Sequence, residues 1–181
     1  MDLAAVAHEC APYVAMQTVR ALVKAESSFD PLAIHVNGGS LDRQPRTLQE
    51  AIVTARALRS SGWDFDMGLA QINVRSAVRL GVPIERVFDP CTNLRLMQRI
   101  LQECFVQASR LLHDPRSDLP AALSCYNTGD MRTGRINGYV DRLVAAAKGA
   151  TAKRQRVPEL QRAASTRQEP DEHHIRKEAS Q

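Results

Sequence analysis

The sequence lacks any apolar run long enough to cross a membrane. A membrane-spanning helix needs about 20 largely apolar residues, and no window of this 181-residue chain approaches that length. The first ten residues also lack a basic segment, and the apolar run Leu3–Ala7 is too short for a secretory signal peptide. The sequence therefore predicts a protein without a membrane span, either cytosolic or exported by a signal that is absent from this sequence.

The chain also lacks the closely spaced cysteine pairs of zinc sites. No C-x-x-C pair occurs among the four cysteines, which are Cys10, Cys91, Cys104 and Cys125. We therefore expect no metal site. Cys91 and Cys104 fall on one predicted helix, about 20 Å apart along its axis, whereas a disulfide needs Cα atoms within about 7 Å. Two pairings remain in an oxidising compartment: Cys10 with Cys91 and Cys104 with Cys125, or the crossed version. In a cytosolic protein all four would be free thiols.

Aromatic residues and cysteines are absent from the C-terminal segment, residues 148–181, where basic residues outnumber acidic ones. Such a segment buries too little apolar surface to offset the entropy lost on ordering. We therefore predict a basic, disordered tail over 148–181. The formal net charge is only +4 for the whole chain, and most of this excess lies in the tail, so the charge does not indicate nucleic-acid binding.

Alternating strand patterns are scarce in residues 1–147, and helical spacing dominates. The clearest apolar stripe covers residues 91–112, with Asp89-Pro90 at the helix entry. Thr47-Leu48-Gln49-Glu50 has the form of a capping box, and the helix that it begins should end near Ser60-Ser61-Gly62. Other helices are expected over 14–25, with Pro12 in the first turn, and over 74–80, 119–124 and 137–147. We predict one mainly α domain over 1–147, with at most a short hairpin around Asn37-Gly38-Gly39.

Candidate chemistry begins with Glu26, which ends the first of these helices at the border of its apolar face. The negative end of the helix dipole and partial burial both disfavour the charged carboxylate and raise its pKa. A general acid that works near neutral pH needs such a carboxyl. Gln71 and Asn73 follow Gly68, and an extended turn directs both side chains to one side. Taken alone, each of these features is also typical of a solvated surface or turn.

Four motifs together resemble the lytic transglycosylase (lysozyme-like) domain. They are Glu26-Ser27, Gly68-Leu69-Ala70-Gln71-Ile72-Asn73, Cys125-Tyr126-Asn127-Thr128-Gly129 and Gly138-Tyr139-Val140, in that order. Residues 29–34 and 89–94 extend the resemblance, which covers about 8–147. More narrowly, the chain resembles the peptidoglycan-degrading subunit of type IV secretion and conjugation systems. The resemblance implies a single mainly α, lysozyme-like domain of the goose-type or soluble lytic transglycosylase kind.

The resemblance implies a role for each motif residue. Glu26 would be the single catalytic acid/base. Six further residues would orient this acid or bind the glycan through hydroxyl, amide and phenol groups: Ser27, Gln71, Asn73, Tyr126, Asn127 and Tyr139. Ser27 would fix the orientation of Glu26, and Tyr139 would support Glu26 or the glycan. Two positions depart from the family pattern, Ala70 and Cys125, and neither change removes a functional polar group.

The implied reaction cleaves the β-1,4 bond between N-acetylmuramic acid and N-acetylglucosamine. Most glycosidases use two carboxylates, but the best second candidate in this sequence, Asp66, matches no expected catalytic position. Glu26 would protonate the glycosidic oxygen while the N-acetyl group stabilises the anomeric carbon. The resulting carboxylate would then deprotonate the 6-hydroxyl of the muramic sugar, which closes a 1,6-anhydro ring. This intramolecular nucleophile benefits from proximity and requires no metal or cofactor.

The resemblance also implies a compartment and partners. Peptidoglycan lies outside the cytoplasmic membrane, so we expect a periplasmic protein whose signal peptide is absent from this sequence. In that setting the resemblance favours the pairing Cys10–Cys91 with Cys104–Cys125. The expected partners are peptidoglycan glycan strands and, through the tail, other type IV secretion subunits; nucleic acid and a membrane span are not expected.

Two alternative functions stay open. One is a lysozyme-type hydrolase, which cleaves the same bond with water, and the other is a non-enzymatic, wall-binding assembly factor. The stretch 35–64 is longer than in compact lysozyme-like domains. We expect it to form either a lid or one wall of the cleft.

Overall fold

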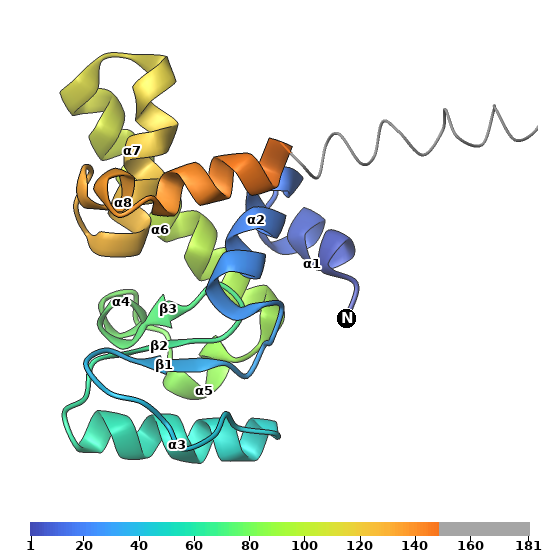
Figure 1. Ribbon diagram of the computed structural model, residues 1–181. Helices are drawn as coiled ribbons and strands as arrows, with labels where there is room; N and C mark the ends of the chain where they lie inside the picture. The colour runs from blue at the N-terminus through green and yellow to red at the C-terminus, as the bar shows by residue number, and fades with distance from the viewer. Residues whose placement is uncertain (149–181) are drawn as a thin grey trace, which may run out of the picture.

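The computed structural model of the chain describes residues 1–148. In chain order the elements are α1 Leu3–Cys10, α2 Met16–Ser27, β1 Ile34–Val36, α3 Leu48–Ser60, β2 Phe65–Met67, β3 Ile72–Asn73, α4 Val74–Arg79, α5 Ile84–Val87, α6 Pro90–Leu112, α7 Pro115–Thr128 and α8 Thr133–Ile136. Residues 139–148 form a further helical run (Figure 1). The predicted mainly α fold is confirmed. The predicted tail lies outside the described residues, apart from Lys148.

Helix α6 is the long support of the fold, and its predicted extent is confirmed. Asp89 caps the helix by accepting a hydrogen bond from Thr92 N at 2.8 Å, and Pro90 occupies the first turn, where its missing N–H is not needed. The inner stripe of α6 is buried at Leu94, Met97 and Leu101. α6 packs against α7 on one side and α1 on the other (Figure 1). The long helix α6 therefore supports the helices that pack on both of its sides.

The beginning of the chain differs from the prediction. An additional short helix, α1, precedes α2, and Pro12 lies in the turn between them instead of in the first turn of a helix. Asp2 caps α1 by accepting from Ala4 N at 2.9 Å. An isolated helix of this length is marginal in water, so tertiary packing must stabilise it. Ala7 and Cys10 supply that packing, since both are buried.

The hairpin predicted around Asn37-Gly38-Gly39 is wrong. Strand β1 pairs antiparallel with β2, which is distant in sequence, and places Ile34 opposite Met67. β2 in turn pairs with β3, so the actual hairpin spans residues 65–73. The alternating residues of β1 are buried against those of β2, and this hydrophobic match outweighs the local turn signal at Gly39.

Helix α3 lies in the segment inserted between β1 and β2. Its predicted start and end are confirmed: Thr47 accepts a hydrogen bond from Glu50 N at 3.2 Å, and Gly62 follows with a positive φ of 76°. Figure 1 places α3 at the opposite end of the molecule from α7. Helix α3, which makes up much of the inserted segment, is therefore far from α7.

Candidate active site

A cleft of about 700 Å³ opens between the sheet region and helices α6 and α7. Residues from α2, the sheet, α4, α6 and α7 line it, and five of the seven predicted site residues are among them: Glu26, Gln71, Asn73, Tyr126 and Asn127. Ser27 and Tyr139 are not among the lining residues. The stretch 35–64 contributes Asn37 and Asp64 but no part of α3, so α3 is neither a lid nor a wall of this cleft.

Glu26 lies in the last turn of α2 and is partly buried. Burial is the main cause that raises the pKa of its carboxyl to about 7, and the negative charge of Asp66 acts in the same direction. The Tyr139 hydroxyl donates a hydrogen bond to Glu26 Oε1, which favours the carboxylate and opposes the rise. A carboxyl with this pKa is present in both protonation states near neutral pH, as an acid/base catalyst requires.

The chain turns sharply immediately after Glu26. Ser28 and Phe29 both have positive φ angles, 53° and 71°, a conformation that non-glycine residues rarely adopt. The Ser27 hydroxyl donates to Val23 O at 3.2 Å and to Leu69 O at 2.8 Å. Ser27 therefore ties the end of α2 to the loop 68–71 of the β2–β3 hairpin. It fixes the position of the backbone that carries Glu26.

The hairpin loop, residues 68–71, is held from behind by Asn93 of α6. Asn93 is fully buried; its Nδ2 donates to Met67 O at 3.0 Å and to Val87 O at 2.8 Å, while its Oδ1 accepts from Ala70 N at 2.8 Å. A Cβ on Gly68 would lie 2.3 Å from Asn93 Nδ2, so this position needs glycine. Sequence reasoning assigned Asn93 no role, although it belongs to one of the stretches that carried the family resemblance.

Gln71 adopts a positive φ of 49° at the end of this loop. Its Nε2 donates to Ala33 O at 3.1 Å and to Gly68 O at 2.9 Å. These two bonds fix the side-chain amide against the protein backbone. The side-chain carbonyl oxygen remains as the hydrogen-bond acceptor that Gln71 can offer to a ligand in the cleft.

Asn73 orients two acidic side chains instead of standing free in the cleft. Its Nδ2 donates to Asp64 Oδ1 at 3.0 Å and to Asp66 Oδ1 at 2.8 Å, and its Oδ1 caps α4 by accepting from Arg75 N at 2.9 Å. Asn37 Nδ2 donates to the other oxygen of Asp66 at 3.2 Å. Burial is the largest influence on Asp66 and raises its pKa in spite of the two amide donors. Asp66 is thus a second carboxyl in the same cleft as Glu26.

Tyr126 joins α7 to the hairpin loop. Its hydroxyl donates to Ala70 O at 2.6 Å, so the loop is held by α6 through Asn93 and by α7 through Tyr126. Burial raises the pKa of both Tyr126 and Tyr139, and both phenols therefore stay protonated donors near neutral pH. Asn127, the next residue, is exposed at the cleft.

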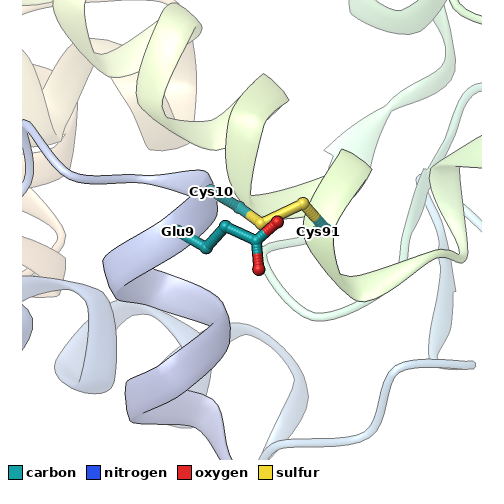
Figure 2. Close-up of side chains that lie close together, drawn as sticks. All are labelled: Glu9, Cys10 and Cys91. Carbon is teal, nitrogen blue, oxygen red and sulfur yellow. A yellow bond between two sulfur atoms is a disulfide. The ribbon is translucent and has the colours of Figure 1, made fainter.

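The structure joins Cys10 to Cys91 and Cys104 to Cys125, the pairing that the resemblance favoured. Cys104 and Cys125 line the cleft, whereas the other disulfide ties α1 to the start of α6. Figure 2 shows the carboxylate of Glu9 beside the Cys10–Cys91 bond. Metal ions bind the thiolate form of cysteine, and both sulfurs are consumed by the disulfide, so this group does not form a metal site.

The family described as "Transglycosylase SLT domain" matches residues 4–147. The type IV secretion system protein virB1 of Brucella suis biovar 1 is 40% identical over 162 residues, which cover 86% of this chain and 68% of the relative. The corresponding protein of Brucella abortus biovar 1 is 41% identical over 80% of this chain and 63% of its own length. Protein virB1 of Agrobacterium fabrum is 37% identical over 78% of this chain and 58% of its own length.

The chain thus spans about two thirds or less of the length of these relatives. No solved structure matches it significantly. Among residues 1–148, no helix combines the length and the apolar character that crossing a bilayer demands.

Proposed function

This chain belongs to the transglycosylase SLT domain family, and we propose that Glu26 is the acid/base with which it cleaves peptidoglycan. The predicted family is thereby confirmed, and the enzyme class is that of a peptidoglycan lytic transglycosylase. The observation that supports the assignment of Glu26 is its pKa of about 7 in a cleft that collects most of the other candidate residues.

The reaction begins with Glu26 in its protonated form. The carboxyl donates its proton to the oxygen of the β-1,4 bond, which breaks and releases the 4-hydroxyl of N-acetylglucosamine. The N-acetyl group of the muramic sugar stabilises the positive charge at the anomeric carbon. The Glu26 carboxylate then takes the proton of the 6-hydroxyl of that sugar, whose oxygen bonds to the anomeric carbon and closes the 1,6-anhydro ring. The proton returns to Glu26, so the enzyme is regenerated.

The remaining candidate residues divide into two groups in this mechanism. Gln71 and Asn127 contact the sugar through amide groups, and Tyr126 lines the cleft beside the cleaved bond while it anchors the loop. Ser27 and Tyr139 position Glu26, one through the backbone and the other through its carboxyl. Asn73 acts through Asp66, because its polar atoms are already bonded within the protein.

The names of the relatives support the cellular setting that we propose. Two of them are named as type IV secretion system proteins, so this chain opens the cell wall locally for the assembly of such an apparatus. Its action on peptidoglycan places it in the periplasm, an oxidising compartment in which both disulfides are stable. Other secretion subunits are partners, and residues 148–181 are the candidate segment for contacting them.

The experiment compares wild type with Glu26→Gln on purified peptidoglycan, with products identified by mass spectrometry. We expect Glu26→Gln to lower the rate by at least about 100-fold, the usual contribution of a general acid. Glu85→Gln is the matched control, since Glu85 is a partly exposed residue outside the cleft, and it should retain wild-type activity. Full activity of Glu26→Gln would contradict the proposed mechanism.

The same digestion tests the two alternatives. A transglycosylase releases products with 1,6-anhydro ends, which are lighter by one water molecule than hydrolysed products. A predominance of hydrated products would identify a lysozyme-type hydrolase, in which Asp66, the cleft carboxylate whose charge acts on Glu26, would be the candidate for activating water. Failure of wild type to cleave, together with normal secretion by Glu26→Gln cells, would identify a non-enzymatic assembly factor.

A further inference from the structure

Two arginines line the cleft and have no part in the reaction described above. Arg75 and Arg79 are four residues apart on α4 and therefore lie on the same face of the helix, with Ser76 between them; all three line the cleft. The other face of α4 is buried through Val74 and Ala77. The burial of that face fixes the helix so that its arginines are presented to the cleft.

The ion pairs of these arginines leave most of their donors free. Arg79 Nη2 lies 2.8 Å from Glu103 Oε2, and Arg75 Nε lies 3.5 Å from Asp64 Oδ1. The side chains of Arg75 and Arg79 are 80% and 53% exposed, and exposed pairs of this kind contribute little energy. A guanidinium carries five N–H donors, so both arginines can bind a further anion without breaking a buried contact.

The charges of the cleft are arranged unevenly. The pKa values of Glu26 and Asp66 are raised because both carboxyls are partly buried, and Glu26, with a pKa of about 7, carries only part of a negative charge near neutral pH. On the side of α4, Glu103 is shared between Arg79 and Arg99, whose Nε lies 3.5 Å from Glu103 Oε1. The two arginines of α4 face two carboxylates in the cleft, Asp64 and Glu103. Because the arginine side chains are solvent-exposed and such pairs are weak, both guanidinium groups stay available to an anionic ligand.

The sugar rings of the proposed substrate do not explain the two exposed arginines in the cleft, because their hydroxyl and N-acetyl groups are neutral. The charged groups of peptidoglycan are on the peptide stem, which is attached through the lactyl ether of muramic acid and ends in a carboxylate. Arginine is the side chain best suited to a carboxylate, since its planar fork can donate two parallel hydrogen bonds.

We propose that Arg75 and Arg79 bind a carboxylate of the peptide stem and so direct the enzyme to stem-bearing strands. This proposal rests on the proposed function and deepens it, because it names the part of the substrate that the α4 side of the cleft recognises. Binding through an exposed charged pair strengthens the enzyme–substrate complex and the transition state equally, so it acts on KM and leaves kcat unchanged.

The test uses two substrates that differ only in stem charge: native peptidoglycan, and the same material with stem carboxylates converted to amides by a carbodiimide and ammonia. For wild type we expect kcat/KM to be about tenfold higher on native material, the lower range for charge-assisted hydrogen bonds, and this preference should weaken at high salt. The double variant Arg75→Gln/Arg79→Gln should cleave both substrates equally, at the rate that wild type shows on amidated material.

Two further variants make the result decisive. Arg56→Gln removes an exposed arginine that pairs with Glu85 outside the cleft, and it should retain the full preference for native material. The pair Arg75→Lys/Arg79→Lys keeps the charge without the fork and should show an intermediate preference. An unchanged preference in the glutamine variant, or equal losses on both substrates, would overturn the proposal. Equal rates of peptidoglycan cleavage by wild type and Glu26→Gln would instead contradict the proposed function.

Discussion

The two walls of the cleft hold their polar groups in different ways. The hairpin wall, formed by the end of α2 and residues 65–73, carries partly buried carboxyls with raised pKa values. Hydrogen bonds from side chains such as Asn93 and Ser27 hold it in place. The α6–α7 wall is tied by the Cys104–Cys125 disulfide, and the charged residue that it presents to the cleft, Glu103, is exposed and ion-paired with Arg79 of α4.

This difference follows from what each wall has to do. A general acid needs a low-dielectric setting, which exposed ion pairs cannot provide, because solvent screens them and a nearby cation lowers the pKa of a carboxyl. The hairpin wall therefore uses neutral donors, the amides of Asn73 and Asn37 and the phenol of Tyr139. A binding surface needs accessible charge, and Arg75 and Arg79 of α4, which pair with Asp64 and Glu103, supply it.

The largest expected effects concern the disulfides. Cys10–Cys91 spans 81 residues and Cys104–Cys125 spans 21, so the chain-entropy description predicts losses of about 4 and about 3 kcal/mol when each is replaced by a pair of alanines. Only the second disulfide lines the cleft. We therefore expect the double variant of Cys104 and Cys125 to lose turnover at temperatures where it remains folded.

Urea unfolding and glycan cleavage, measured on both double variants, check this expectation. The variant lacking Cys10–Cys91 serves as the control, because it should be the less stable of the two and yet keep its turnover. If both variants lost turnover, each in proportion to its loss of stability, the two disulfides would differ only in how much they stabilise the fold. The Cys104–Cys125 disulfide would then have no separate role in shaping the cleft.

The next effect tests the support of the hairpin wall. Asn93→Ala removes three hydrogen bonds and leaves Met67 O, Val87 O and Ala70 N unpaired in the interior. We expect a loss of about 3 kcal/mol in the free energy of unfolding, because a buried unpaired polar group costs about 1–3 kcal/mol. Thr92→Ala is the control: it removes one exposed hydroxyl bond to Asp89 and should cost less than about 1 kcal/mol. Equal losses of unfolding free energy in Asn93→Ala and Thr92→Ala, measured by chemical denaturation, would show that the buried bonds of Asn93 do not support the hairpin wall.

Glu26 should destabilise the protein at alkaline pH. Its pKa is about 7 in the folded chain against 4.5 for the ordinary side chain, so folding favours the protonated form. That contribution is complete below pH 4.5 and is lost as the pH rises through 7. We therefore expect Glu26→Gln to be more stable than wild type by about 3 kcal/mol at pH 8 and nearly equal to it at pH 4, as measured by urea unfolding. A uniform difference across this range would contradict the raised pKa.

Much of the helical framework was predictable because its signals are local. The capping residues Asp89 and Thr47 announce α6 and α3 directly, and the apolar stripe of α6 fixes which face is buried. The catalytic candidates were predictable for a different reason, since their order along the chain resembles a known family. The motifs of that family contain about half of the residues that line the cleft.

The sheet and its supports were not predictable from local signals. β1 and β2 are three residues each and are separated by α3, so their pairing depends on long-range burial that no sequence window contains. Asn93 appears in the sequence as one polar residue in the first turn of a helix, and only the folded structure shows that its side chain is buried. Asp66 likewise becomes notable only when folding brings it into the cleft with Glu26.

The smallest expected effects tune the acid itself, and they have opposite signs. The hydrogen bond from Tyr139 lowers the pKa of Glu26, whereas the charge of Asp66 raises it. Tyr139→Phe should therefore move the alkaline limb of the kcat/KM profile to higher pH, because Glu26 stays protonated longer. Asp66→Asn should move it to lower pH. At any one pH above 7 we expect each change to be less than about tenfold, since one pKa unit corresponds to a factor of ten.

Full pH profiles separate these shifts from a general loss of activity, which lowers the plateau without moving the limb. Tyr13→Phe is the control, because Tyr13 is exposed and outside the cleft, and its profile should match wild type. Unshifted limbs in both Tyr139→Phe and Asp66→Asn would mean that burial alone sets the pKa of Glu26. In that case the neutral donors of the hairpin wall would serve to hold the side chains in place and would not tune the acid.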